Sequence, residues 1–524
     1  MKRFGLLLLM LLAFPTPALA AEEDSSATFL DFLDWVDTAF SEAVAAIKTV
    51  FFFQVGGGVP IIVAWLILGG IYFTLRMGFV NLRGFKHAIQ VLLGKYQDKS
   101  GVGEEGEGEV SPFQAVSTAL SATVGLGSIA GSAIAIQLGG PGAVVWMSLA
   151  GFLGMSSKFV ECTLGQKYRM VRTDGTIAGG PMYYLSQGLS EMGVPWLGKS
   201  LAVLFALLCV GASFGAGNMF QANQSYAAVA NVVPYLADRS WLYGFAIALL
   251  VGVVIVGGIS RIGAVTSNLV PVVVALYIVG CLWIILSNYA EIPIVLTTML
   301  KQAFSAEAIE GGFIGVLVQG IRRAAFSNGA GIGSAAIAHS ATRNKEPVRE
   351  GMVASIEPLI DTIIICNLTG MVVVITGVSE ISAASGANGI ELTAAAFNTV
   401  IGWFPVVLAI AVVLFAFSNI IAWSYYGEQA WTYLFGAPST LAFKALFVIF
   451  VFIGTVVNLG AVLDFSDMML LGMAVPNLLG CFLLSGKVAA DLKTYMSKLK
   501  LEKMPVPQAN STASDEKSTG RTEN

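Results

Sequence analysis

Two glycine-rich stretches lie in the middle of long apolar segments, at residues 125–132 (GLGSIAGS) and 328–334 (NGAGIGS). Aligning Gly127 with Gly329 also aligns Gly131 with Gly333, at one offset (329 − 127 = 333 − 131 = 202). Each glycine costs roughly 1 kcal/mol in a helix interior relative to alanine, so both helices are predicted to unwind locally. Unwound backbone is tolerated at membrane depth only where it lines a cavity, which predicts a binding site between two breaks. Close helix packing through small residues is the alternative.

Broken helices present the groups that bind a small charged molecule. The half-helices starting after Gly127 and Gly331 would offer free N–H groups and positive dipole ends to a carboxylate. Unwound carbonyls and helix C-terminal ends would offer acceptors to a cation or an ammonium group. Such a site requires no charged side chain.

Amides and charged residues also interrupt the apolar segments. The amides cluster in one span: Asn218, Gln221, Asn223 and Gln224. They are expensive in lipid unless they face a cavity or bond across helices. The charged residues are Glu161, Arg322, Arg323, Glu357 and Asp361. We interpret these as internal ion pairs or gates, and Asp361 is the one to test for ion coupling.

Composition places the chain in a membrane. Of its 524 residues, 56% are hydrophobic and only 12% are charged, whereas soluble domains carry about 25% charged residues. The five cysteines show no metal-binding spacing, and nucleic-acid binding has no support. With two histidines, His87 and His339, a histidine-based proton relay has little to work with.

Eleven apolar segments are long enough to cross roughly 30 Å of hydrocarbon as helices. They are predicted at about 59–79, 113–139, 142–166, 200–230, 241–259, 265–288, 312–340, 351–378, 396–433, 440–457 and 463–486. Residues 1–20 read as a signal peptide, with an uncleaved first helix as the alternative. Residues 21–55 are predicted to form an amphipathic segment on the outer membrane surface. Residues 487–524 are predicted to form a disordered cytoplasmic tail.

Basic residues set the predicted orientation. They gather in the loop at 81–112 and in every second loop after it, which indicates a cytoplasmic side under the positive-inside rule. The mature N-terminus is then outside and the C-terminus is cytoplasmic. Segment 113–139 runs outward and segment 312–340 runs inward, so residues 113–290 and 312–486 form two units of opposite topology. This predicts an all-α polytopic protein with the LeuT-type 5+5 inverted repeat, plus one extra N-terminal helix at 56–80.

Six strings, in order along the chain, resemble the alanine/glycine:cation symporter family, also called sodium:alanine symporters. They are residues 121–131 (SATVGLGSIAG), 139–143 (GGPGA), 178–184 (AGGPMYY), 326–335 (FSNGAGIGSA), 361–366 (DTIIIC) and 415–428 (FAFSNIIAWSYYGE). With the connecting spans, the match covers about residues 56–486. The resemblance implies a symporter, not an enzyme, that uses a sodium gradient to import small neutral amino acids by alternating access. It also implies a monomer in a bacterial inner membrane.

The resemblance assigns roles to individual residues. The implied Na⁺ ligands are Gly125, Ser128, Ser418 and Asn419. The implied substrate-binding residues are Gly125, Gly127, Ser128, Gln221, Ser327, Asn328, Gly331, Asn419 and Trp423, although ordinary packing also explains Trp423. The implied gating or structural residues are Gly131, Arg323, Gly329, Gly333 and Asp361.

Three positions depart from the family pattern and leave the substrate and the coupling ion open. An Asn is usual where Ser128 stands, a Glu at Gly329 and a Thr at Asn419. One alternative is therefore a proton-coupled or glutamine-type transporter. A membrane sensor or channel is a further alternative, but neither a signalling domain nor rings of pore-lining charge are visible.

Overall fold

The computed structural model describes residues 25–503, apart from 52–53, 56–58, 94, 96–107, 174, 306–311 and 379–387. The predicted signal peptide, most of the glycine-rich linker before Pro112 and the end of the tail lie outside these residues. Within the described part, eight helices are long and apolar enough to span a membrane. Two shorter apolar helices, α3 (Ile61–Arg76) and α12 (Ser240–Ile255), accompany them. The chain is thus a multi-pass helical membrane protein.

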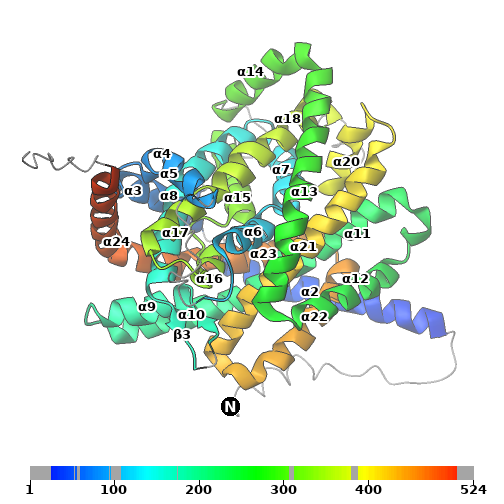
Figure 1. The fold of residues 1–524 in the computed structure, drawn as a ribbon. Coiled ribbons are helices and arrows are strands. Elements are labelled where there is room, and N and C mark those ends of the chain that lie inside the picture. Colours follow the sequence, from blue (N-terminus) through cyan, green and yellow to red (C-terminus); the bar gives the residue numbers. More distant parts are fainter. Residues whose placement is uncertain are drawn as a thin grey trace, which may run out of the picture.

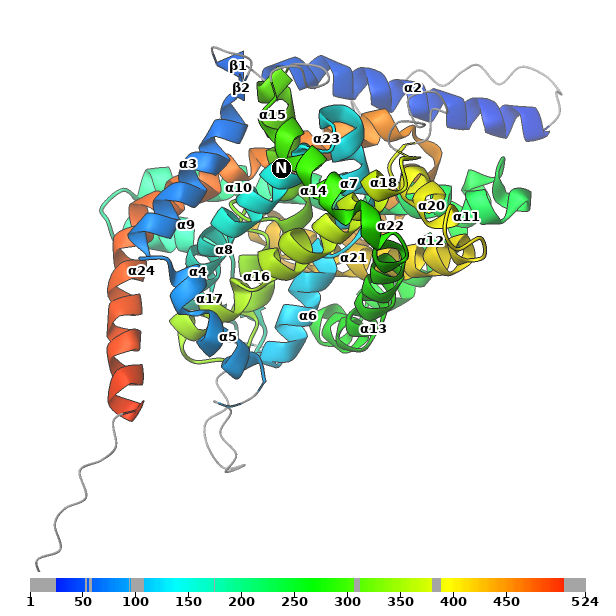
Figure 2. The ribbon, with the colours of Figure 1, turned by 90° about the horizontal axis from the view of Figure 1, so that it is seen from above.

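The amphipathic segment forms one long helix, α2 (Ser25–Phe51), which lies across one side of the molecule (Figure 2). Its Asp37 accepts hydrogen bonds from the side chain and backbone of Asn458, and Lys48 pairs with Asp464 at 2.7 Å. Both partners belong to the start of α23 (Leu459–Gly472). The acidic and basic positions of α2 therefore attach it to the bundle.

The extra helix α3 leads through a tight turn into two short helices, α4 (Val80–Arg83) and α5 (Phe85–Leu92). Two short antiparallel pairs lie outside the bundle: β1 (Gln54–Val55) with β2 (Val59–Pro60), and β3 (Met170–Val171) with β4 (Ile177–Ala178). The helices α4 and α5 make the predicted loop at 81–112 partly helical.

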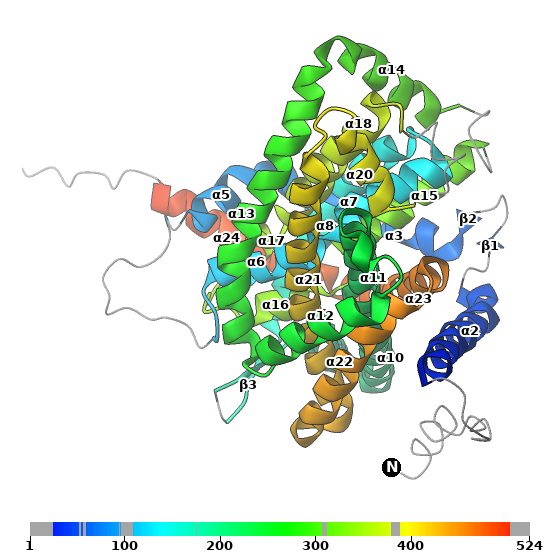
Figure 3. The ribbon, with the colours of Figure 1, turned by 90° about the vertical axis from the view of Figure 1, so that its right-hand side faces the viewer.

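The bundle is built from long helices that are interrupted at defined places (Figures 1 and 3). Its first half holds α6 (Pro112–Thr123), α7 (Leu126–Gly139), α8 (Ala143–Lys167), α9 (Pro181–Ser190), α10 (Pro195–Phe214), η1 (Gly215–Met219), α11 (Phe220–Val232), η2 (Pro234–Leu236), α12 and α13 (Gly258–Ser287). Ser111 begins α6 with a capping box, because its hydroxyl accepts the Gln114 N–H while the Gln114 side chain accepts the Ser111 N–H.

The second half begins with two helices on the edge of the bundle and then repeats the pattern of interrupted spans. It holds η3 (Tyr289–Glu291), α14 (Ile292–Ala303), α15 (Gly312–Asn328), α16 (Ala335–Ser340), α17 (Pro347–Ala354), η4 (Leu359–Cys366), α18 (Asn367–Ile375), α20 (Ile390–Asn398), α21 (Phe404–Phe435), η5 (Ala437–Ser439), α22 (Thr440–Val456), α23 and α24 (Ala474–Lys503). Both η1 and η4 are π-helical, and π-helical turns are frequent at functional sites.

Three features of the helices differ from those predicted. The predicted span at 396–433 is divided, because Trp403 and Pro405 start α21 after a separate α20. The helix α24 continues to Lys503, so the tail predicted to be disordered from residue 487 is helical over its first part. The helix α14 lies outside the predicted spans. The indole N–H of Trp146 in α8 donates to the carbonyl of Ala303 in α14.

Candidate functional site

The first helix break lies at Val124 and Gly125, between α6 and α7. The Leu126 N–H, at the buried start of α7, donates to Oε1 of Gln221 over 3.3 Å. A β-carbon built on Gly125 would lie 2.8 Å from Nδ2 of Asn419 and 3.4 Å from Oε1 of Gln221. The backbone at the break is therefore in direct contact with the side-chain amides of Gln221 in α11 and Asn419 in α21. Both residues were expected beside this stretch.

The α21 helix supplies two further polar groups at this break. Trp423 donates its indole N–H to the carbonyl of Ala122 over 3.0 Å, which satisfies one of the carbonyls left unpaired at the end of α6. Asn419 is 2% exposed, and its Oδ1 accepts no hydrogen bond from the described residues. A buried carbonyl oxygen without a donor is costly, so it is available to a cation or an ammonium group.

The second break is longer and runs from Gly329 to Ser334, between α15 and α16. Gly329, Gly331 and Gly333 have φ angles of +64°, +88° and +84°, a left-handed conformation that favours glycine. Asn328 stabilises the start of the break, since its Oδ1 accepts the Ala330 N–H and its Nδ2 donates to Thr362 Oγ1. The glycine run therefore unwinds the chain, as predicted.

Buried side chains of other helices form hydrogen bonds at the second break. Asn477 of α24 donates to the Gly331 carbonyl and to Oε1 of Glu161, both over 2.8 Å. Tyr184 in turn donates to Oδ1 of Asn477. A cavity of about 50 Å³ adjoins this break, between Asn328, Ala330 and the extra helix α3.

Gly127 and Gly131 do not lie in a break, so the prediction that the half-helix starts after Gly127 is wrong. Both belong to α7, which begins at Leu126. A β-carbon on Gly127 would lie 3.3 Å from Phe326 and 3.4 Å from the Ser327 Cα, whereas one on Gly131 would meet nothing closer than 3.9 Å. Gly127 thus allows the first turn of α7 to pack closely against the end of α15.

The two broken helices meet at one buried carboxylate. Asp361 of η4 accepts hydrogen bonds from Ser128 at the start of α7, from Ser327 at the end of α15 and from Thr362. The Ser128 and Ser327 hydroxyl oxygens are 3.0 Å apart, and every one of these side chains is at most 1% exposed. Carboxylate and hydroxyl oxygens in this arrangement can coordinate a hard cation.

Three of the four predicted Na⁺ ligands are in contact, and the ligand role of all four stays a prediction. Gly125 contacts Asn419, the Gly125 carbonyl accepts the Ser128 N–H over 3.1 Å, and the Ser128 hydroxyl donates to Asp361. The Ser418 hydroxyl donates to the Phe415 carbonyl of its own helix over 3.0 Å. Among the described residues, no hydrogen bond joins Ser418 to the other three. Asp361 was predicted as a gating or structural residue rather than a ligand. The signal for its role was an aspartate in the middle of an apolar span.

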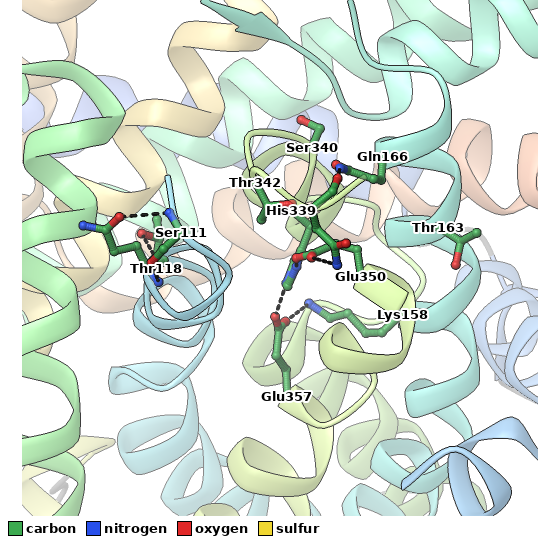
Figure 4. A network of polar contacts seen from close by, with 12 residues as sticks. Ser111, Thr118, Lys158, Thr163, Gln166, His339, Ser340, Thr342, Glu350 and Glu357 are labelled. Carbon is green, nitrogen blue, oxygen red and sulfur yellow. Dashed lines mark hydrogen bonds and ion pairs between the residues drawn. The ribbon is translucent and has the colours of Figure 1, made fainter. Parts of the chain in front are cut away.

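A second buried network joins α8, α16 and α17 (Figure 4). Lys158 pairs with Glu357 at 3.0 Å, and His339 contacts Glu357 through Nε2 at 2.5 Å and Glu350 through Nδ1 at 2.6 Å. All four side chains are fully buried. The expectation that Glu357 forms an internal ion pair is confirmed, but Lys158 and His339 were missed as its partners. The network fixes the half-helix after the second break to its neighbours.

The buried pair makes a stability prediction. Lys158→Met should destabilise the fold by about 3–5 kcal/mol, because it removes one partner of a fully buried ion pair and leaves Glu357 with His339 alone. Lys167→Met is the matched control, since Lys167 pairs with Asp491 at 2.5 Å but both side chains are about one-third exposed, and such pairs contribute at most about 1 kcal/mol. Unfolding by sodium dodecyl sulfate in mixed micelles measures both. Equal losses for the two variants would contradict the assignment of the network.

Two arginines of α15, before the second break, form ion pairs with an aspartate of α23. Arg322 and Arg323 of α15 both donate to Asp467 of α23, and the Arg323 guanidinium lies 5.0 Å from the centre of the Phe326 ring. Arg323 is 1% exposed. The expectation of an ion pair for these arginines is confirmed. Because α15 ends at the site, these two ion pairs connect the site to α23 and, through Asn458, to α2.

Comparisons of the sequence with known proteins point to one family, and a comparison of structures shows a related fold. The model of the sodium:alanine symporter family matches residues 40–509. A sodium/alanine symporter of Methanococcus maripaludis is 40% identical over 82% of this chain and 93% of its own. A Bacillus subtilis protein named as a probable sodium/glutamine symporter is 35% identical over 85% of this chain and 90% of its own. Among solved structures, MhsT in complex with L-phenylalanine matches with a TM-score of 0.51 and 17% identity, over 71% of this chain and 88% of that one.

Proposed function

Because the chain belongs to the sodium:alanine symporter family, we propose that it imports alanine-sized neutral amino acids together with Na⁺ by alternating access. Members of this family are sodium-coupled amino-acid transporters rather than enzymes, and Na⁺ is the co-transported ion. The single observation that carries the finer proposal is the meeting of both broken helices at Asp361, through Ser128 and Ser327. One site can then bind the ion and the substrate together.

The ion occupies the region around the Asp361 carboxylate in this proposal. Ser128 and Ser327 coordinate the ion through their hydroxyl oxygens, with the hydroxyl protons pointing away from the ion. Asn419 Oδ1 supplies a neutral oxygen at the first break. The substrate carboxylate lies against the bound ion and the N–H groups at the start of α7, where the helix dipole favours a negative charge. The ammonium group takes carbonyl oxygens of the breaks, at Gly125 and at residues 327–331.

Close packing supports a small substrate. A β-carbon on Gly127 would lie only 3.3 Å from Phe326, and the ring of Phe220 packs edge-on against Phe326 with centroids 4.9 Å apart. Trp423 and Gln221 complete the wall beside the first break. The name of the Bacillus subtilis relative supports the glutamine alternative. Binding of glutamine would require these aromatic side chains to move apart.

The architecture proposed is a 5+5 inverted repeat with α3 as an extra helix. Some predicted segments correspond to one described helix and others to helices interrupted by breaks or π-helical turns, such as α10, η1 and α11 at 200–230. The likeness to MhsT supports the fold. The Arg323–Asp467 pair would form the gate on the outer side, and the His339 network would hold the inner side closed. The outside N-terminus, the cytoplasmic C-terminus, the bacterial inner membrane and the monomeric state remain part of this proposal.

Uptake into proteoliposomes tests the substrate and the ion together. The panel consists of labelled alanine, glycine, serine and glutamine, with either an inward Na⁺ gradient or choline and a pH gradient. We expect alanine and glycine to compete best and uptake to require Na⁺, because neutral and carboxylate oxygens form the site. Preferred uptake of glutamine would replace the small-substrate proposal, and full uptake in choline driven by pH would replace sodium coupling.

A further inference from the structure

A basic groove lies where α3, α4, α17 and α24 come together. It encloses about 410 Å³, and Arg76, Arg83 and Lys493 line it with no acidic residue among its lining. Figure 2 shows this end of α3 and α24 on the side of the molecule opposite to α2. The Asp361 site uses none of these residues, so the groove is separate from it.

The turn after α3 brings two of the cations together. Gly78 and Phe79 have φ angles of +60° and +56°, and Phe79 is the only non-glycine residue with positive φ in the described part of the chain. This turn folds α4 back, and Arg83 donates one N–H to the Gly78 carbonyl over 3.2 Å. The other guanidinium N–H groups of Arg83 are left for a ligand. All three cations are exposed, and within the described residues Arg76 and Lys493 enter no ion pair.

The rest of the groove is apolar. Leu492 and Met496 lie one turn apart on α24, on the same face as Lys493, and Met77, Val80 and Met352 complete the floor. The flank of α3 and α4 beside it exposes Leu75 (61%), Leu82 (60%) and Phe79 (44%). Since Arg76 ends an apolar helix of membrane type, the cations lie at the level where lipid headgroups meet hydrocarbon.

We propose that this groove binds one anionic phospholipid, whose phosphate lies between Arg76, Arg83 and Lys493. Arginine suits the phosphate because its planar guanidinium donates two parallel hydrogen bonds. An acyl chain follows the apolar floor between α24 and α4. A basic pocket between membrane helices is the arrangement that such headgroups select. The lipid thereby connects the extra helix α3 to the last helix α24.

Native mass spectrometry of the purified full-length chain tests the site with defined lipids. The probes are phosphatidylglycerol and phosphatidylcholine with the same acyl chains, and glycerol 3-phosphate as the soluble headgroup. The variant is Arg76→Gln with Arg83→Gln and Lys493→Gln. The control, Lys86→Gln with Lys199→Gln and Arg261→Gln, removes the same charge from exposed positions outside the groove.

We expect the wild type and the control to retain one tightly bound phosphatidylglycerol. Each groove cation should contribute about fivefold in affinity, so the triple variant should bind on the order of a hundredfold more weakly. If the triple variant unfolds, Lys493→Gln alone should show the fivefold loss. Equal affinity of variant and wild type, or equal binding of phosphatidylcholine, would overturn the site. Binding of glycerol 3-phosphate as tightly as of phosphatidylglycerol would overturn the lipid assignment.

Discussion

Gly333→Ala is expected to abolish most transport, whereas Gly193→Ala is expected to leave it nearly unchanged. The two glycines have almost the same left-handed conformation, with φ of +84° and +81°. Alanine costs about 1–2 kcal/mol in that conformation at either position. A β-carbon on Gly333 would also lie 2.7 Å from Asn477 Oδ1 and 2.8 Å from Pro181, whereas one on Gly193 meets nothing within 4 Å.

The difference between the variants follows from Asn477. This side chain holds the Gly331 carbonyl, so displacing it changes the geometry of the second break. Overpacking adds about 1–3 kcal/mol, which corresponds to roughly a 5- to 150-fold loss if it falls on the bound state. Initial uptake rates per folded transporter in proteoliposomes measure it. Similar rates for the two variants would show that the second break does not position the ligands.

Asp361→Asn is expected to raise the Na⁺ concentration for half-maximal uptake by roughly 30-fold or more. The amide keeps the shape of the side chain but removes the charge that faces the ion, and losing one partner of a buried charge pair costs about 2–5 kcal/mol. Ser327 can still donate to the amide oxygen, and the Ser128 hydroxyl can accept from the amide N–H, so the protein should fold. Uptake measured over a series of Na⁺ concentrations checks the prediction.

The control for Asp361→Asn is Asp491→Asn, which removes a carboxylate that is one-third exposed and pairs with Lys167. It should leave the Na⁺ dependence unchanged. If Asp361 only holds the helices together, its variant will lose folded protein while the surviving transporters keep the ordinary Na⁺ dependence.

The existence of both helix breaks and the position of the second could be predicted from the sequence, but the position of the first could not. Helices end at Thr123 and Asn328, an offset of 328 − 123 = 205, whereas the glycine alignment has an offset of 202. Glycine spacing alone does not distinguish a residue that unwinds a helix from one that lets helices approach. Gly333 does the first through its positive φ, and Gly127 does the second against Phe326.

The partners of the buried charged residues also could not be predicted from the sequence. Lys158 and Glu357 are separated by 199 residues, and nothing local connects them before α8 packs against α17. The scarcity of histidine suggested little role for His339, yet this residue contacts two buried glutamates. By contrast, Gln221, Asn419 and Asp361 could be chosen from sequence, because polar groups within apolar spans must find partners or a ligand.

Equilibrium binding of labelled alanine to the purified protein, titrated with Na⁺ in place of choline, tests the central claim most directly. If Na⁺ and alanine meet at the two breaks, Na⁺ must raise alanine affinity, and alanine must raise Na⁺ affinity by the same factor. At Na⁺ concentrations just high enough to saturate the wild type, we predict a rise of roughly 5–150-fold in the wild type and in Asp491→Asn. We predict little or no rise in Asp361→Asn at the same concentrations, because its Na⁺ dependence shifts to roughly 30-fold higher concentrations. A full rise in Asp361→Asn at these concentrations would contradict the account.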